Sequence, residues 1–179
     1  MYKRQEKRFC TALSSKVEIN HSLYGILLEE AWQENGKIAL LLQPDYGFLF
    51  DLLSSLKPVH SLRIDHLFCV SPEGQMNENN ELYSLEYLQT MLPLFVADLD
   101  YHPFYFYGDI ASRSFNFAGL SCLILTSKYA IACTSDYQMG VLYGNPEVVS
   151  MLWDLFASYK EKGTELFPVS YTHLRAHET

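Results

Sequence analysis

The sequence is poor in positive charge. Its 179 residues include 13 Lys and Arg against 21 Asp and Glu, so the formal net charge is -8. Proteins hold the phosphate backbone of nucleic acids chiefly through Lys and Arg side chains. We therefore expect that this stretch of chain does not itself bind DNA or RNA.

Long hydrophobic runs and paired cysteine motifs are also missing. No apolar run reaches the roughly 20 residues that a transmembrane helix needs, so we expect no membrane partner. The cysteines Cys10, Cys69, Cys122 and Cys133 form no CxxC pair. Three of them lie in apolar runs, where a cysteine behaves as a small hydrophobic side chain. Unpaired, buried thiols fit a reducing compartment, which predicts a cytoplasmic protein.

The motifs of the large enzyme families are absent as well. The sequence contains no GxGxxG, GxxxxGK[ST], GxSxG or HExxH pattern. The first two bind nucleotide phosphates through backbone amides, and the last two present a nucleophile or a pair of zinc-binding histidines. We therefore predict no catalytic residues, no cofactor, no metal ion and no enzymatic activity.

The two termini differ from the rest of the chain. Residues 1–5 and 168–179 resemble translations of the two adapters of one sequencing kit. Such segments are set aside before the fold is considered, so His173 and His177 are not interpreted as metal ligands. We predict that residues 6–19 are a linker from a missing upstream domain and that residues 20–167 form one sensor domain of a longer bacterial protein.

A helix is predicted over residues 20–35. Asn20 or Ser22 can cap its start, and Asn35-Gly36 is typical of a helix end. One face is apolar at helical spacing. Its residues are Leu23, Ile26, Leu27, Ala31 and either Leu28 or Trp32.

A β-α-β unit follows this helix. The apolar run 37–42 is too short for a helix and indicates a strand covered on both faces. Asp45 can then cap a helix that continues to Leu56. Residues 62–70 have the pattern of a second strand. A crossover of this kind places the two strands parallel in one sheet.

The second half of the sequence predicts a long helix and several shorter elements. The helix covers residues 81–98 and contains Pro93, which should kink it or end it early. Its expected apolar side consists of Leu82, Leu85, Leu88, Leu92 and Phe95. The elements expected after it are a strand at 101–107, a hairpin at 120–126 and 129–134, a strand at 139–143 and a helix capped by Asn145. The expected fold class is thus α/β, with a mixed sheet and flanking helices.

Two polar clusters could support chemistry. Asp98, Asp100 and His102 place two carboxylates and an imidazole within five residues, which could suit a hard cation, although a charged helix end is the more economical reading. His66 and Asp65 could form a base and its orienting group. However, alternation along a strand places these two side chains on opposite faces, so we expect structural roles for them.

An aromatic segment is the most unusual feature of the sequence. Tyr105 and Tyr107 should face one side of the sheet, and Phe104 and Phe106 the other, so only one pair can line a single cavity. Aromatic side chains often line ligand pockets, although core packing is the more economical explanation. We name these four residues and Arg113 as the candidate ligand site. The stretch 135–140 is expected to be a simple turn between strands.

The order of elements near the C-terminus resembles a known family. The residues that carry the resemblance are Leu123–Asp136, Gly140–Tyr143, Asn145–Val149 and Leu155-Phe156. They resemble the effector-sensing domain of clostridial-type helix-turn-helix transcriptional regulators, and the segment Leu23–Val70 is similar to these domains as well. The resemblance implies a phospholipase D-like fold, a small-molecule effector, and DNA binding only through a missing N-terminal module.

The catalytic motif of phospholipase D enzymes is absent. That motif, HxKxxxxD, begins with a nucleophilic histidine. The residues two positions after His21, His60, His66 and His102 are Leu, Leu, Phe and Phe. None of the four histidines can therefore begin the motif, and a domain of this fold would bind a ligand without transforming it.

These observations predict a non-catalytic ligand-sensing or dimerisation domain of a bacterial transcriptional regulator. The expected partners are a small-molecule effector and a second copy of the chain. One alternative is a stand-alone, metal-assisted hydrolase, which requires that Asp98, Asp100 and His102 converge in a cleft. Another is a pure protein-interaction module that associates through an edge strand or the last helix and exposes a contiguous apolar patch.

Overall fold

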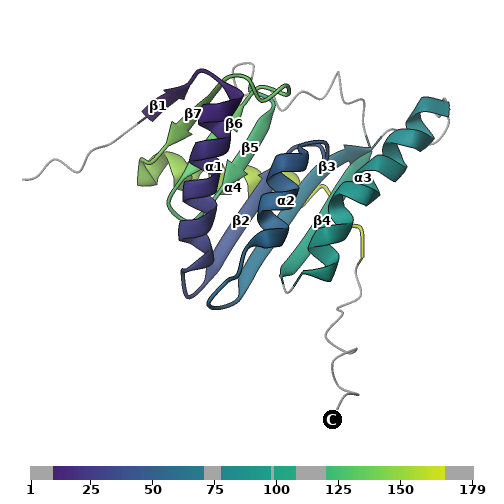
Figure 1. Cartoon of the computed structure of the whole chain (residues 1–179), viewed down its shortest axis with the longest axis horizontal. Coiled ribbons are helices and arrows are strands. Elements are labelled where there is room, and N and C mark those ends of the chain that lie inside the picture. The colour runs from purple at the N-terminus through teal and green to yellow at the C-terminus, as the bar shows by residue number, and fades with distance from the viewer. Residues whose placement is uncertain (1–9, 71–77, 98, 108–119, 168–179) are drawn as a thin grey trace, which may run out of the picture.

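One mixed β-sheet with helices on both faces makes up the structure (Figure 1). The computed structural model describes residues 10–70, 78–97, 99–107 and 120–167, and side chains in helix α3 from residue 85 onward. The strands are β1 (Cys10–Leu13), β2 (Gly36–Leu41), β3 (Leu62–Val70), β4 (Asp100–Tyr107), β5 (Cys122–Leu125), β6 (Ala130–Cys133), β7 (Gly140–Tyr143) and β8 (Thr164–Glu165). The helices are α1 (Lys16–Ala31), α2 (Gly47–Ser55), α3 (Glu78–Val96) and α4 (Pro146–Lys160).

The sheet has a parallel half and an antiparallel half. Its strand order is β1-β7-β6-β5-β2-β3-β4-β8. Strands β2, β3 and β4 are parallel, whereas every other pair of neighbours is antiparallel. Strand β2 is the boundary, because it pairs in parallel with β3 and antiparallel with β5. The α/β class and the mixed sheet predicted from the sequence are confirmed.

Helices α1, α2 and α3 cover one face of the sheet, and α4 covers the other (Figure 1). Two hydrophobic cores result. The larger lies under the three helices and includes Leu23, Leu53 and Ile124. The smaller lies under α4 and includes Leu125 and Phe156. The predicted β-α-β unit corresponds to β2-α2-β3, and α3 forms a second crossover between β3 and β4.

The predicted linker is wrong for residues 10–19. Strand β1 pairs antiparallel with β7, and α1 begins at Lys16 rather than near Asn20. The backbone N–H of Glu18 donates to Ser15 Oγ at 3.2 Å, and the Glu18 carboxylate accepts from the backbone N–H of Ser14 at 2.6 Å. This Ser-x-x-Glu pattern is a capping signal in the sequence. Strand β1 has only four residues, too few to show a strand pattern.

Three residues of the predicted apolar face of α3 are turned outward, whereas Phe95 packs against the core as expected. Leu85, Leu88 and Leu92 are exposed, while Met91 and Leu94 are buried against the sheet side. The helix has apolar residues on two sides, so spacing alone could not identify the packed one. Pro93 lies in the last turn, where the helix continues through a bond from the Ala97 N–H to the Pro93 carbonyl at 3.0 Å.

The other predicted elements agree with the structure apart from one cap. Helix α2 begins after Tyr46, which is its N-cap residue. The prediction that Asp45 caps this helix is therefore wrong. Strands β5 and β6 form the predicted hairpin. Asn145 caps α4, because its side-chain oxygen accepts from the N–H groups of Glu147 and Val148. No helix in the described part of the chain has both the length and the apolar character needed to cross a bilayer.

A buried carboxylate joins the two halves of the sheet. Glu30, at the end of α1, is 2% exposed. It accepts the backbone N–H of Lys37 at 2.9 Å, where β2 begins, and the N–H and hydroxyl of Ser127 at 3.0 and 2.7 Å, in the β5–β6 hairpin. A side chain at Gly36 could not fit, because its Cβ would lie 2.7 Å from the Glu30 carbonyl oxygen.

We predict that Glu30→Ala lowers the free energy of unfolding by about 2 to 3 kcal/mol, because three donors lose a charged acceptor. The neighbouring Glu29 forms an exposed ion pair with Lys128 at 2.7 Å. Glu29→Ala is therefore the matched control and should lower it by less than about 1 kcal/mol. Urea denaturation of both variants checks this, and equal losses would contradict the role given to Glu30.

Candidate functional site

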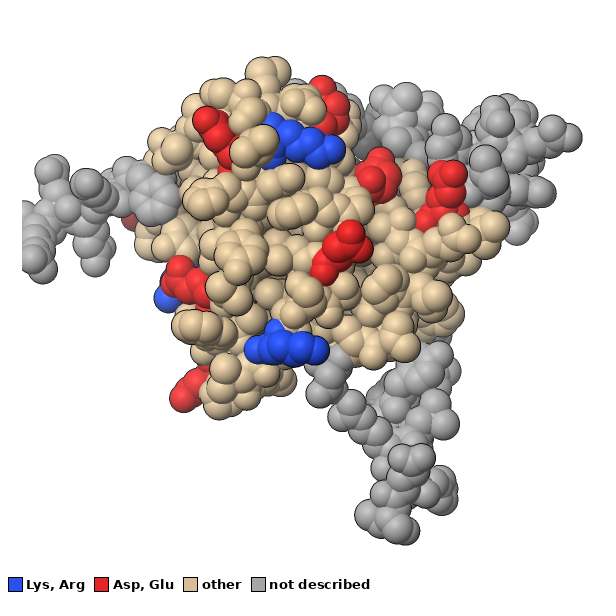
Figure 2. Space-filling view, in the orientation of Figure 1, with Lys and Arg blue, Asp and Glu red and all other residues tan. Residues whose placement is uncertain are grey.

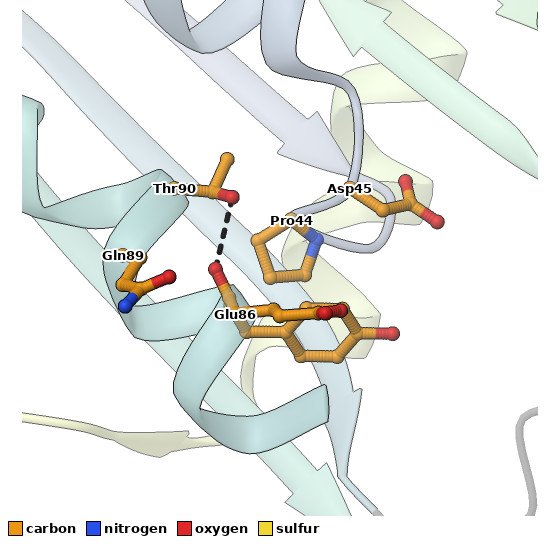
Figure 3. Close-up of a pocket in the computed structure, with 6 residues that line it drawn as sticks. Pro44, Asp45, Glu86, Gln89 and Thr90 are labelled. Carbon is orange, nitrogen blue, oxygen red and sulfur yellow. Dashed lines mark hydrogen bonds between the residues drawn. The ribbon is translucent and has the colours of Figure 1, made fainter. Parts of the chain in front are cut away.

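A cleft lies between the β2–α2 turn and helix α3 (Figure 3). Its volume is about 450 Å³. The turn contributes Pro44 and Asp45, and α3 contributes Glu86, Tyr87, Gln89 and Thr90. In Figure 3, Glu86, Gln89 and Thr90 come from α3 and Pro44 and Asp45 from the turn. Thr90 Oγ1 donates to the Glu86 carbonyl oxygen at 3.0 Å.

The cleft lies at the place in the fold where α/β proteins commonly bind ligands. Pro44 and Asp45 follow β2, so they are at the carboxyl end of the parallel strands. The strand order also reverses at β2, because the chain runs outward from β2 through β3 to β4 on one side and from β5 through β6 to β7 on the other. In open α/β sheets, ligands bind outside the carboxyl ends of the strands at such a switch point. This position makes the cleft the candidate functional site.

The lining of the cleft is rich in hydrogen-bond acceptors. Asp45 and Glu86 supply carboxylates, Gln89 an amide and Thr90 a hydroxyl. The lining residues include no Lys or Arg. Such a set can accept hydrogen bonds from a ligand with hydroxyl or ammonium groups, and it opposes the binding of an anion.

A tyrosine from the antiparallel half of the sheet supports Asp45. The hydroxyl of Tyr137, in the β6–β7 turn, donates to Asp45 Oδ1 at 2.7 Å. Desolvation raises the pKa of the Asp45 carboxyl, and this hydrogen bond opposes the rise. Tyr137 adopts a φ of 58°, a left-handed conformation that is uncommon outside glycine. The expected simple turn therefore also contacts the candidate site.

Tyr46 fixes the position of Tyr137. The two rings stack with centroids 3.7 Å apart and an angle of 11° between their planes. The Tyr46 hydroxyl donates to Asn20 Oδ1 on α1. Burial raises the pKa of Tyr46 to about 12, so this phenol stays neutral at physiological pH. The support behind Asp45 is thus an uncharged aromatic pair held from two sides.

The aromatic residues predicted to bind a ligand do not line this cleft. Phe104 and Phe106 pack against the core under α4, whereas Tyr105 packs against the core under the three helices. The alternation expected from the sequence is therefore observed. Tyr107 is exposed, and its ring meets that of Tyr105 edge-on at 5.5 Å. Arg113 lies outside the described residues, and a ligand role for this set stays a prediction.

The predicted carboxylate and imidazole cluster is only partly described, because Asp98 lies outside the described residues. His102 Nε2 lies 2.7 Å from Asp100 Oδ1, and its Nδ1 lies 2.9 Å from Glu165 Oε1 on β8. These contacts lie near an edge of the sheet, and the Asp100 side chain is 56% exposed. No group of three or more His, Cys, Asp and Glu within the described ranges is arranged to hold a metal ion.

His66 has a structural position in the core. It is fully buried, and its ring nitrogens lie 2.8 Å from the Tyr101 hydroxyl and 3.0 Å from the Leu42 carbonyl oxygen. Asp65 instead accepts from Lys160 of α4 at 2.8 Å, on the opposite face. The predicted separation of His66 from Asp65 is confirmed, which removes this pair as a base and its orienting group.

No protein-family model matches the sequence, and no curated protein matches it. Among solved structures, it is similar to TrmBL2, an archaeal chromatin protein described as showing a novel mode of DNA binding, with 8% identity and a TM-score of 0.47 over 92% of this chain and 56% of that one. It is also similar to a polyphosphate kinase from Porphyromonas gingivalis, with 13% identity and a TM-score of 0.44 over 90% of this chain and 27% of that one.

The chain thus spans about half the length of TrmBL2 and about a quarter of the polyphosphate kinase. Neither likeness, at TM-scores of 0.47 and 0.44, carries an argument about what this chain binds. The class that fold and site define is an α/β domain with a mixed open sheet and a cleft at the strand switch point. The phospholipase D-like assignment and the clostridial regulator family stay predictions.

His66 should make the fold sensitive to acid. Burial lowers its pKa from 6.5 to about 4. Between pH 6.5 and pH 4, His66 is protonated in the unfolded chain but stays neutral in the folded chain. The stability that His66 contributes as a neutral side chain is therefore fully present above pH 6.5 and is lost as the pH falls toward 4. The loss amounts to about 3 kcal/mol. Denaturation from pH 7 to pH 4 measures it, and His66→Gln should flatten the profile while His21→Gln, on the surface of α1, should not.

Proposed function

We propose that this chain is a non-catalytic ligand-sensing domain of a bacterial transcriptional regulator, and that its effector binds in the cleft between the β2–α2 turn and α3. The observation that carries the ligand site is the position of the cleft at the carboxyl end of β2, beside the strand switch point. The regulator assignment is supported by the sequence resemblance to effector-sensing domains. The net charge of -8 is consistent with a sensing domain that leaves DNA contact to another module.

The chemistry of the cleft favours an effector that is rich in hydrogen-bond donors. Asp45 and Glu86 are acidic, and the remaining polar groups are the Gln89 amide and the hydroxyls of Thr90 and Tyr87. A polyol or an amine would satisfy these acceptors, whereas a dicarboxylate would be repelled. The proposed effector is therefore neutral or cationic.

Helix α3 connects the ligand cleft with an exposed apolar surface. Glu86, Gln89 and Thr90 face the cleft, while Leu85, Leu88 and Leu92 are exposed on the same helix. A ligand that draws α3 toward the β2–α2 turn would therefore change the position of an apolar stripe. Two sites that share one rigid element can be coupled in this way when each favours one position of it.

The proposed ligand site can be tested with probes of opposite charge. We expect a polyol or a diamine, titrated into isotopically labelled chain, to shift the amide signals of Asp45 and residues 86–90, and a dicarboxylate to leave them unchanged. Glu86→Lys should weaken binding at least about tenfold, because it places a cation among the acceptors. Asp154→Lys, on the exposed side of α4, makes the same charge change at a distance and serves as the control. Equal weakening by both variants would contradict a specific site.

A second function is favoured by the outer surface of the three helices. Figure 2 shows this face with only scattered charged side chains. Trp32 on α1 is 66% exposed and Leu92 on α3 is 60% exposed. The exposed apolar side chains of the three helices are Val17, Tyr24, Trp32, Phe48, Leu85, Leu88, Leu92 and Val96. Soluble monomers seldom expose large contiguous apolar patches, so we propose that this face binds a second copy of the chain.

The dimer proposal places the contact on α3 and not on the last helix. We expect the chain to sediment as a dimer and Leu88→Glu to shift it toward monomer, because a charge would be buried at the contact. Met151→Glu introduces the same charge at an exposed position of α4, on the opposite face, and should leave the dimer intact. Analytical ultracentrifugation over a concentration series distinguishes these outcomes. A wild-type chain that stays monomeric would exclude this second function.

A further inference from the structure

Two buried cysteines lie directly opposite each other in the antiparallel half of the sheet. Cys122 on β5 and Cys133 on β6 are register partners. They are 5% and 0% exposed and belong to the core under the three helices. Neither thiol is in a disulfide. The hairpin predicted from the sequence, with its turn at residues 127–128, places these two positions opposite each other.

The geometry of the pair allows a bond between the two sulfurs. Residues directly opposite in antiparallel strands have Cα atoms about 4.5 to 5.5 Å apart. Disulfides span Cα separations of about 4.4 to 6.8 Å, so the register places the two positions within the Cα range of a disulfide. The two thiols already form a hydrogen bond with each other. A cross-strand disulfide can therefore form within the existing register.

The surroundings make the two thiols unequal. The Cys133 thiol and the Ser121 hydroxyl hydrogen-bond to the Cys122 sulfur, and the Tyr137 hydroxyl lies within hydrogen-bond range of it, which lowers the pKa of Cys122. The hydrogen bond to Cys122 and burial raise the pKa of Cys133. Only a thiolate attacks a disulfide at a useful rate, and it must be reached by the oxidant. Cys122 is the less buried of the two thiols, 5% exposed against 0%, so it is the attacking sulfur and Cys133 the resolving one.

We propose that Cys122 and Cys133 form a reversible dithiol–disulfide site that is oxidised by small-molecule disulfides of the glutathione class. The Cys122 thiolate attacks one sulfur of the oxidant, which releases one thiolate and leaves a mixed disulfide on Cys122. Cys133 then gives up its proton and attacks the Cys122 sulfur, which releases the second thiolate. The chain loses two protons and two electrons, which together are two hydrogen atoms, and the oxidant takes them up to become two thiols.

The same site is connected to the cleft through Tyr137. The Tyr137 hydroxyl has one proton, and both Asp45 and Cys122 lie within hydrogen-bond range of it. A disulfide sulfur is a weaker acceptor than a thiolate, so oxidation leaves Asp45 as the acceptor of that proton. This link to ligand binding rests on the proposed function, whereas the disulfide itself does not.

The 179-residue chain can be tested in folded form and without a ligand. We expect incubation with oxidised glutathione to remove two hydrogens from the protein mass, and peptide mapping without reduction to join the peptides of Cys122 and Cys133. Cys10→Ser and Cys69→Ser are the matched controls and should still lose two hydrogens. Cys133→Ser should instead retain one glutathione on Cys122. Peptide mapping of the wild-type chain identifies the two bonded cysteines even where a variant folds poorly.

The hydroxyl of Tyr137 provides a second readout. Tyr137→Phe removes the hydroxyl that lies within hydrogen-bond range of the Cys122 sulfur and should slow oxidation by up to about tenfold, the change that one pKa unit makes in the thiolate fraction. The proposal is overturned if the wild-type chain keeps its mass in oxidised glutathione unless it is unfolded, or if the mapped bond involves Cys10 or Cys69. An unchanged rate in folded Tyr137→Phe would overturn the role of Cys122 as the attacking thiol.

Discussion

The buried carboxylate of Glu30 determines how the two halves of the sheet meet. It accepts the backbone N–H of Lys37 near the start of β2 on one side and the N–H and hydroxyl of Ser127 in the β5–β6 hairpin on the other. A single side chain therefore joins the boundary strand to the hairpin. A buried charge of this kind is stable only while its hydrogen bonds are complete. The hairpin and the parallel strands are therefore expected to form together as one cooperative unit.

The opposite end of β2 carries the candidate site, and both halves of the sheet contribute to it. The parallel half provides the cleft through Asp45 and α3, while the antiparallel half provides Tyr137 and the cysteine pair. Because Tyr137 reaches Asp45 across the boundary, a change in either half can be sensed in the other. This arrangement suits a domain that reports on its surroundings and does not by itself indicate a reaction.

Much of the fold was predictable because its signals are local. The apolar runs at 37–42 and 62–70, the hairpin and the Asn145 cap each depend on residues close in sequence. The Ser-x-x-Glu pattern at Ser15 is an equally local signal for the start of α1. The exposure of Leu85, Leu88 and Leu92 could not be predicted from their spacing, because α3 has apolar residues on two sides. The bond between Tyr137 and Asp45 joins positions 92 residues apart, so no local pattern could reveal it.

Both outer strands of the sheet are short. Strand β1 has four residues and β8 has two, and β8 pairs with β4 at Phe104 and Tyr105, in the middle of a strand of eight residues. An uninterrupted edge would offer a row of backbone groups on which foreign strands could polymerise. The brief final strand divides that row into two pieces, which limits fibre growth along the rim of the sheet.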